Sequence, residues 1–305
     1  WDFADGAWLH APSGLIREDN SVKPSYLELK RVTKDLATRQ AEANVLNYEE
    51  QLRIQREEGQ YAQHMATKQT SQALVFQVTG FTSLVNIYQT HYAINLQNEL
   101  KLVAHVANDS SFTDVEKATF ILMASSHQDC MNYPNRKNGR NQAISALAQS
   151  KLWTKSFPTF EDLYDQVCQT LTDPATGKLI FGIGSLALYD VAKRIGASLA
   201  QPVYPSAYVY LNAGAMKGAK NLFPQQKLSD RTSTALFQPY FPSLSSLEIE
   251  DLLCITKGMI SNGNVVTQSC AAPKPWVPTD FYHRSMRDFL TLRSRIDTIA
   301  KQILP

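Results

Sequence analysis

GIGSLALYDVAKRIG, residues 182–196, joins two glycines directly to a stretch that reads as a helix carrying Lys193 and Arg194. Glycines immediately before a helix leave backbone N–H groups pointing outward at the positive end of the helix dipole, which is the physical requirement for binding an anion. The stretch therefore predicts a tight turn, a helix over 185–200, and a capacity to bind phosphate.

Two interpretations of this turn stay open. In the first, a phosphate accepts hydrogen bonds from the turn and nearby cations supply charge, which involves Gly182, Ile183, Gly184, Ser185, Lys193, Arg194 and Lys217. In the second, the glycines only permit a turn between packed helices. Asp190 and Arg194 then form a surface pair worth about 0.3–0.5 kcal/mol, and Lys217 and Lys220 solvate a helix end.

Composition bounds the class of protein. The chain has 305 residues, of which 44% are hydrophobic and 19% charged, a balance typical of globular domains. A formal net charge of +2 gives no global basic field, so any phosphate contact is local. Four cysteines without close pairing predict free thiols in a reducing compartment, and the chain is expected to be cytoplasmic, with no transmembrane segment, metal or cofactor.

Helical signals dominate the rest of the chain, and the fold class we predict is mainly α. Thr113 and Glu116 form a capping box that predicts a helix start. Residues 72–107 are strongly apolar and predict core, with a short strand possible near ALVFQV. Further helices are expected over 141–152, 159–171, 185–200, 206–221, 245–260 and 279–303.

The composition changes along the chain and predicts three parts. Residues 1–70 form an extended arm and a long exposed helix, residues 71–265 a multi-helix core that contains a helix-hairpin-helix, and residues 266–305 a C-terminal linker and helix. A long helix with few contacts needs a surface to cover it, so residues 25–107 could bind a second copy or another protein.

Residues 179–222 resemble the helix-hairpin-helix segment of the DNA base-excision glycosylases, in which a GxG hairpin grips a DNA phosphate. Gly182, Ile183 and Gly184 match that hairpin. The lysine that some members use lies where this chain has Ser185, Leu186 and Ala187, and the catalytic aspartate falls within YVYLNAG, so no catalytic residue carries over.

Residues 112–257 resemble, over a longer span, a family of bacterial proteins with no established activity. Three ordered motifs carry this resemblance, namely GIGSLALYDVAKRIG, VYLNAGAMKGA and EDLLCITK. It suggests that one group of residues converges in space: Tyr189, Asp190, Arg194, Tyr210, Asn212, Lys217, Glu250, Asp251 and Lys257.

A polar loop, ASSHQDCMNYPNRKNGRNQ, offers two further sites. Arg136, Lys137 and Arg140 predict a small basic patch that would extend the anion surface if the loop lies beside the turn. His127, Asp129 and Cys130 carry ligand-type atoms, but the loop holds no second cluster for a metal and no residue that would orient a Cys–His nucleophile.

Two short stretches resemble other families. Residues 6–30 look like the closing segment of (β/α)8 glycoside hydrolases, and residues 46–69 look like the helical tail of stomatin- and flotillin-like proteins. Neither supplies a catalytic residue. The function predicted from sequence is non-catalytic binding of the nucleic-acid backbone, with an assembly protein and a diverged DNA-repair-like enzyme as alternatives.

Overall fold

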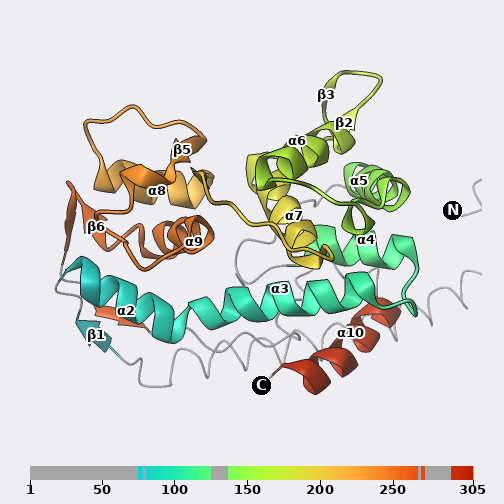
Figure 1. The fold of residues 1–305 in the computed structure, drawn as a ribbon, viewed down its shortest axis with the longest axis horizontal. Helices are drawn as coiled ribbons and strands as arrows, with labels where there is room; N and C mark the ends of the chain where they lie inside the picture. The colour runs from blue at the N-terminus through green and yellow to red at the C-terminus, as the bar shows by residue number, and fades with distance from the viewer. Residues whose placement is uncertain (1–74, 78–79, 125–136, 267–268, 272–289, 305) are drawn as a thin grey trace, which may run out of the picture. The chain divides into compact units, whose positions relative to one another are not determined.

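The computed structural model describes residues 75–77, 80–124, 137–266, 269–271 and 290–304 (Figure 1). The chain divides into two units, Trp1–Gln72 and Ala73–Pro305, and all of the described residues belong to the second. This unit is mainly helical, as predicted. The predicted arm and long helix of residues 1–70, the triplet His127, Asp129 and Cys130, and most of residues 266–289 lie outside the described residues.

Two consecutive helices, α2 (Phe81–His91) and α3 (Ala93–Asn108), run end to end along one edge of this unit (Figure 1). Only Tyr92 separates them. Most of their apolar side chains are buried, including Leu84 on α2 and Leu102 on α3, so the prediction that this segment belongs to the core is confirmed. Phe81 and Ala104 are partly buried, and Ile94 has 39% of its surface exposed.

The first hydrophobic core forms between α3 and a group of helices that pack above and below it. Its members include Phe120, Leu163 and Ile195, all at most 2% exposed. The helices are α4 (Asp114–Met123), α5 (Lys137–Ser150), α6 (Phe160–Thr170), α7 (Ser185–Ser198) and α10 (Leu290–Ile303), with the 3-10 turn η2 (Leu152–Thr154). α10 contributes Leu292, Ile296 and Ala300 to this core, although the sequence predicted a separate C-terminal part.

The capping box predicted at the start of α4 is confirmed. The Glu116 amide donates to the Thr113 hydroxyl at 3.2 Å, and the Thr113 amide donates to the Glu116 carboxylate at 2.8 Å. α9 begins with the same capping box, on Ser245 and Glu248, and at the start of α6 the Asp162 amide donates to the Thr159 hydroxyl at 3.1 Å. These caps satisfy amides that have no partner within the helix, which is why the sequence located the helix starts well.

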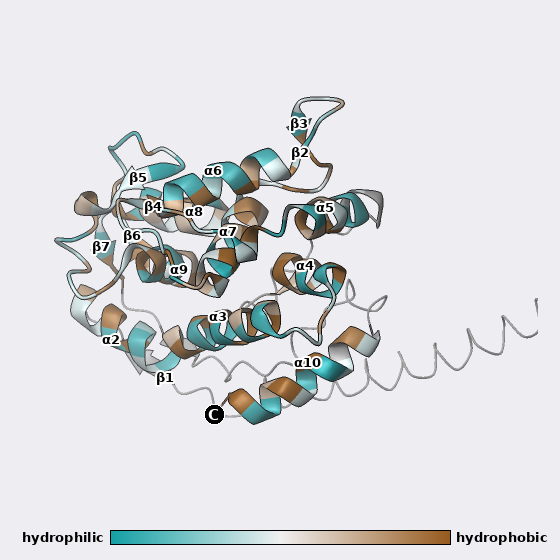
Figure 2. Cartoon of the chain, turned by 45° about the vertical axis from the view of Figure 1, so that its right-hand side comes forward, coloured by the Kyte–Doolittle hydropathy of each residue, from teal (hydrophilic) through white to brown (hydrophobic). Residues whose placement is uncertain are grey.

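The second core lies between α2 and a pair of tightly packed helices, α8 (Ala213–Leu222) and α9 (Ser246–Thr256). Gly218 on α8 makes the close approach possible, because a Cβ there would lie 2.3 Å from the Leu253 carbonyl oxygen. Figure 2 shows the hydrophobic residues of α7 and α9 in the interior and hydrophilic residues on the outward side of α6.

The described strands form short antiparallel pairs rather than a large sheet. They are β1 (Val75–Gln77) with β8 (Ser269–Ala271), β2 (Thr172–Asp173) with β3 (Lys178–Leu179), β4 (Tyr208–Tyr210) with β5 (Arg231–Ser233), and β6 (Ile260–Ser261) with β7 (Asn264–Val265). In the β4–β5 pair, Tyr210 lies opposite Arg231.

One predicted element needs correction here, and another stays untested. The helix expected over 206–221 begins only at Ala213, because Tyr208, Val209 and Tyr210 have the aromatic and β-branched side chains that favour strands. The connection between α6 and α7 is also longer than a simple hairpin, since it contains the β2–β3 pair before the glycine turn. A helix-hairpin-helix therefore stays a prediction.

Candidate functional site

The glycine turn lies between β3 and α7. Gly182 has φ +89°, a left-handed conformation that only glycine adopts without strain. Gly182, Gly184 and Ser185 are exposed, whereas Ile183 is buried and its amide donates to the Ile180 carbonyl at 2.9 Å. The Ile183 amide therefore already has a hydrogen-bond partner within the turn. Gly182, Gly184 and Ser185 form the part of the turn that is exposed to solvent.

Gly184 is the N-cap of α7 and brings no side-chain cap to it. The Leu188 amide donates to the carbonyl of the N-cap residue Gly184 at 3.0 Å. This is the bond with which the helical hydrogen-bonding pattern of α7 begins. The preceding amides of a helix have no partner within it and carry the positive end of its dipole. An anion could therefore accept from them without disturbing the helix.

Lys193 and Arg194 do not lie on the surface beside this turn. They are 3% and 1% exposed and face the interior, where both lie against Glu99 of α3. Arg194 also donates to the Ile121 carbonyl at 3.0 Å. The prediction that these two cations contact a phosphate is not supported by this burial, because their charges are already neutralised inside the molecule.

The buried charge cluster, as we call it here, consists of Glu99, Asp190, Lys193 and Arg194. Arg194 Nε lies 2.6 Å from Glu99 Oε1, Lys193 Nζ lies 3.0 Å from Asp190 Oδ1, and Arg194 Nη2 lies 3.5 Å from Asp190 Oδ2. Asp190 and Arg194 were interpreted as a surface pair. They are instead 8% and 1% exposed, and the pair is part of the interior.

The electrostatics of this cluster favour the charged forms of Glu99 and Lys193. Burial opposes ionisation of Glu99, but the neighbouring Lys193 and Arg194 lower its pKa below the ordinary value. Burial likewise opposes the charge of Lys193, whereas Asp190 and Glu99 raise its pKa. Two carboxylates thus balance two cations between α3 and α7.

Other polar residues of the predicted converging group lie nearby. Tyr189 is fully buried, and burial together with the charges of Glu250, Asp190 and Asp251 raises its pKa. Tyr88 of α2 donates to the Asp251 carboxylate at 2.9 Å. The structure therefore brings together part of the group that the sequence motifs suggested, at the junction of the two cores.

Lys217 and Lys257 of the same group lie elsewhere. Lys217 is exposed on α8, within the part of the unit built around the second core. Lys257 follows α9, and its ammonium donates to the Cys254 carbonyl at 2.8 Å. Asn212 is the N-cap residue of α8 and is buried.

The predicted basic patch is only partly described. Arg136 lies outside the described residues, and Lys137 is described only as the first residue of α5. Arg140 is 5% exposed, so it is not a surface cation. The start of α5 does lie beside the glycine turn, because a Cβ on Gly139 would approach the Phe181 carbonyl oxygen to 1.9 Å.

Comparisons with protein families, curated proteins and solved structures found no match. The family resemblances of the sequence motifs accordingly stay predictions, and function has to be argued from this chain's own residues.

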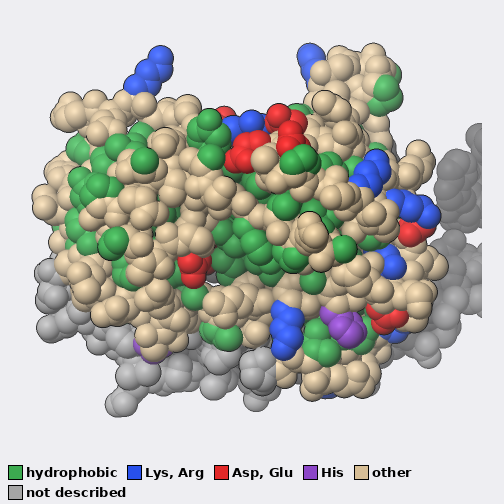
Figure 3. Space-filling view, viewed as in Figure 1, with side chains coloured by type: hydrophobic (Ala, Val, Ile, Leu, Met, Phe, Trp, Pro, Cys, Tyr) green, Lys and Arg blue, Asp and Glu red, His purple; other side chains and the backbone are tan. Residues whose placement is uncertain are grey.

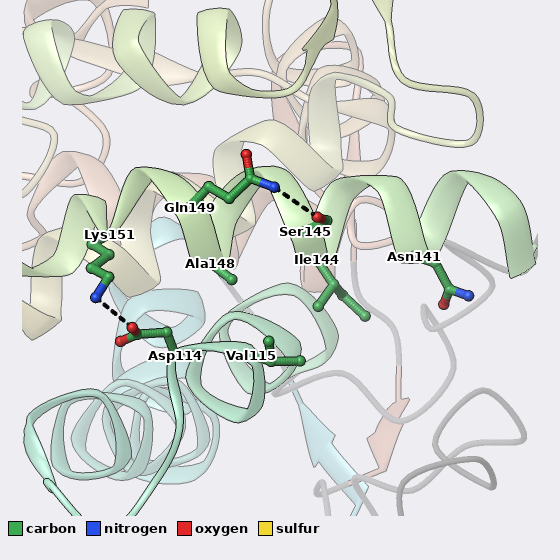
Figure 4. A pocket seen from close by; sticks show the side chains of 8 residues that line it. All are labelled: Asp114, Val115, Asn141, Ile144, Ser145, Ala148, Gln149 and Lys151. Atoms are coloured by element: carbon green, nitrogen blue, oxygen red, sulfur yellow. Dashed lines mark hydrogen bonds and ion pairs between the residues drawn. The ribbon is translucent and has the colours of Figure 1, made fainter.

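A shallow groove of about 560 Å³ lies between α4 and α5 (Figure 4). The exposed Val115 and the buried Ile144 form its apolar floor, and the Asp114–Lys151 ion pair closes one end. The remaining lining residues are Asn141, Ser145, Ala148 and Gln149. The groove belongs to neither the glycine turn nor the buried charge cluster.

Two further observations apply to the described part of the chain. It contains no group of three or more His, Cys, Asp or Glu side chains arranged to hold a metal ion. None of its helices combines the length and the apolar character needed to cross a membrane. Cys168 and Cys254 are in the thiol form rather than in a disulfide.

Sequence reasoning missed Glu99, which is the centre of the buried charge cluster. One signal was present: Glu99 is a carboxylate within an apolar helical segment, and a buried carboxylate requires a cationic partner. It also missed the contact of Arg231 with the rings of Tyr164 and Tyr210, because these residues meet only through the fold.

Proposed function

We propose that this protein binds the backbone of single-stranded nucleic acid at the glycine turn, without catalysing a reaction on it. The observation that carries the proposal is the uncapped start of α7 at Gly184, exposed beside Phe181. Helix amides suit a phosphate, and an exposed aromatic ring suits an unpaired base. Phe181 is 56% exposed.

The two proposed contacts, base stacking on Phe181 and phosphate binding at the glycine turn, are of the kinds that a nucleotide strand offers. Phe181 directly precedes Gly182, so a stacking surface and a phosphate seat are neighbours in the chain. Lys178 on β3 is exposed three residues before Phe181 and would add a cation for a second phosphate. Phosphate contacts position a strand without reading its bases, so sequence-specific binding is not expected.

The buried charge cluster has a supporting role in this proposal. Lys193 and Arg194 lie two to three helical turns beyond the glycine turn and bind α7 to Glu99 on α3. This fixes the helix whose first amides would hold the phosphate. A diverged DNA-repair-like enzyme is less well supported, because no lysine occupies residues 185–187 after the turn and no aspartate lies within YVYLNAG, residues 208–214.

Assembly through residues 25–107 is the alternative function. Part of that segment lies outside the described residues. Within α2 and α3, the apolar side chains are used in the chain's own core, with Ile94 as the exposed exception. No specific observation on the described residues favours assembly over nucleic-acid binding.

The test exploits the open space around Gly184, where a Cβ would have no atom within 4 Å. Gly184→Asp places a carboxylate where the phosphate would bind, whereas Gly184→Ala adds a side chain without charge. We expect fluorescence anisotropy with a labelled oligothymidylate at low salt to show binding by the wild type and Gly184→Ala, and none by Gly184→Asp.

A second variant tests the stacking contact. Phe181→Ala should weaken binding of the same single strand by about 1–3 kcal/mol, roughly 5- to 150-fold, with less effect on a duplex whose bases are already stacked. Wild-type protein that binds no strand at low salt, or Gly184→Asp that binds as tightly as Gly184→Ala, would refute the proposal.

A further inference from the structure

A second surface with its own chemistry lies where α6 meets the β4–β5 pair. Figure 3 shows acidic side chains gathered at the upper rim of a hollow between these elements, with apolar side chains deeper in it. We call this surface the acid–aromatic patch. It comprises Glu161, Tyr164 and Asp165 of α6, Tyr210 of β4, and Asp230 and Arg231 at the start of β5.

The patch already binds one guanidinium, which is the chain's own. Arg231 lies over the rings of Tyr164 and Tyr210, 4.7 and 5.6 Å from their centres, and donates to the Asp165 carboxylate. Aromatic faces and a carboxylate together attract a cation. This arrangement demonstrates the type of group that the patch selects.

Two buried oxygen atoms of the patch remain without a partner among the described residues. Glu161 Oε1 and the Tyr210 hydroxyl are both buried, and neither has a hydrogen-bond partner among the described residues. Tyr210 is only 2% exposed. Burial and the Glu161 carboxylate raise the pKa of Tyr210, so its hydroxyl stays protonated and neutral. A buried oxygen without a partner costs about 1–3 kcal/mol, which a bound donor would recover.

We infer that the acid–aromatic patch binds a basic side chain, lysine or arginine, of a partner peptide. The patch holds three carboxylates, on Glu161, Asp165 and Asp230, and one guanidinium, that of Arg231, so it has an excess of negative charge. This charge favours a basic peptide and repels a nucleic-acid strand. The inference is independent of nucleic-acid binding at the glycine turn.

Arg231 is an internal stand-in: its guanidinium occupies the position that we assign to the partner's basic side chain. Its side chain is 37% exposed and that of Asp165 is 58% exposed, and an ion pair this exposed contributes little to stability. An incoming cation can therefore displace Arg231 from Asp165 and donate to Glu161 and Tyr210. Binding of the partner exchanges one guanidinium for another group of the same charge.

The test uses a fluorescently labelled hexa-arginine peptide as the probe, titrated with the full chain at low salt. Glu161→Gln and Tyr210→Phe each change a few atoms and should weaken binding about tenfold, about 1.4 kcal/mol. The controls are Asp114→Asn, which removes an exposed carboxylate on α4, and Tyr208→Phe, which removes an exposed hydroxyl from the same strand as Tyr210. Both controls should bind as the wild type does.

A third variant tests the stand-in role. Arg231→Gln should bind the peptide more tightly than the wild type, and Lys220→Gln, which removes an exposed cation on α8, should not. Absence of wild-type binding, an equal loss in Asp114→Asn and Glu161→Gln, or no change in Tyr210→Phe would overturn the inference. Far-UV circular dichroism of each variant checks that the fold is retained.

Discussion

Arg194 and Glu99 form a fully buried ion pair, with Arg194 Nε 2.6 Å from Glu99 Oε1, between residues 95 positions apart in the chain. The pair joins α7 to α3. Together with Lys193 and Asp190 it makes the interior of this helical unit depend on electrostatics as well as on apolar packing. Several measurable properties of the protein follow from this relationship.

The first prediction concerns the stability supplied by the pair. Glu99→Gln should lower the free energy of unfolding by about 3–5 kcal/mol, because it leaves Arg194 and Lys193 buried with one carboxylate fewer. Urea denaturation followed by circular dichroism measures the change. Asp114→Asn breaks the exposed pair with Lys151 and serves as the control, with an expected loss of at most about 1 kcal/mol. Equal losses in the two variants would contradict the interpretation.

The second prediction concerns acid. The pKa of Glu99 is lower in the folded protein than its ordinary value of 4.5, so the unfolded chain takes up its proton first as the pH falls. The contribution of Glu99 to stability is therefore present above its unfolded pKa and is lost as the pH falls through its folded pKa. Glu99→Gln lacks this titration.

Urea denaturation at a series of pH values tests the sign. The difference in unfolding free energy between the wild type and Glu99→Gln should be largest near neutral pH and should shrink as the pH falls below about 4.5. A difference that stays constant over this range would show that folding does not change the pKa of Glu99, and a difference that grows as the pH falls would show that folding raises it.

The third prediction concerns the contact between α8 and α9. Gly218→Ala would place a Cβ 2.3 Å from the Leu253 carbonyl oxygen, and backbone atoms cannot move aside cheaply. We expect a loss of about 1–3 kcal/mol in unfolding free energy. Lys220→Ala, on an exposed position of the same helix, should change stability by at most about 0.5 kcal/mol. A tolerated Gly218→Ala would mean that the two helices are farther apart.

Local chemistry explains which parts of the fold were predictable from sequence. Thr113 and Glu116 are three residues apart and satisfy each other's amides, so the start of α4 needs no tertiary information. The strand at Tyr208–Tyr210 was missed because its partner, Arg231–Ser233, lies some twenty residues later, and strand pairing is a long-range property.

The candidate site shows the same division. The turn at Gly182 and Gly184 and the helix after it follow from local sequence. The direction of Lys193 and Arg194 does not, because a helix with charged residues looks the same in sequence whether those residues face solvent or a buried carboxylate. Only the packing of α3 against α7, which places Glu99 beside them, decides between these two environments.

The last prediction separates the stability of α7 from binding at its N-terminus. Gly184 is an N-cap without a side-chain cap, in an extended conformation with φ −111° that any residue adopts. Aspartate at this position can accept from the first helix amides and oppose the positive end of the dipole, whereas alanine can do neither. Gly184→Asp should therefore unfold with a free energy about 1 kcal/mol higher than that of Gly184→Ala.

This expected gain in stability makes it possible to distinguish a loss of binding from a loss of fold. A variant that is more stable than its control and yet binds no strand has lost the phosphate-binding site and kept its fold. The reason is that the same amides cannot donate to the carboxylate introduced by Gly184→Asp and to a phosphate at the same time. If Gly184→Asp is instead less stable than Gly184→Ala, the amides at the start of α7 are already engaged, and the glycine turn has no free seat for an anion.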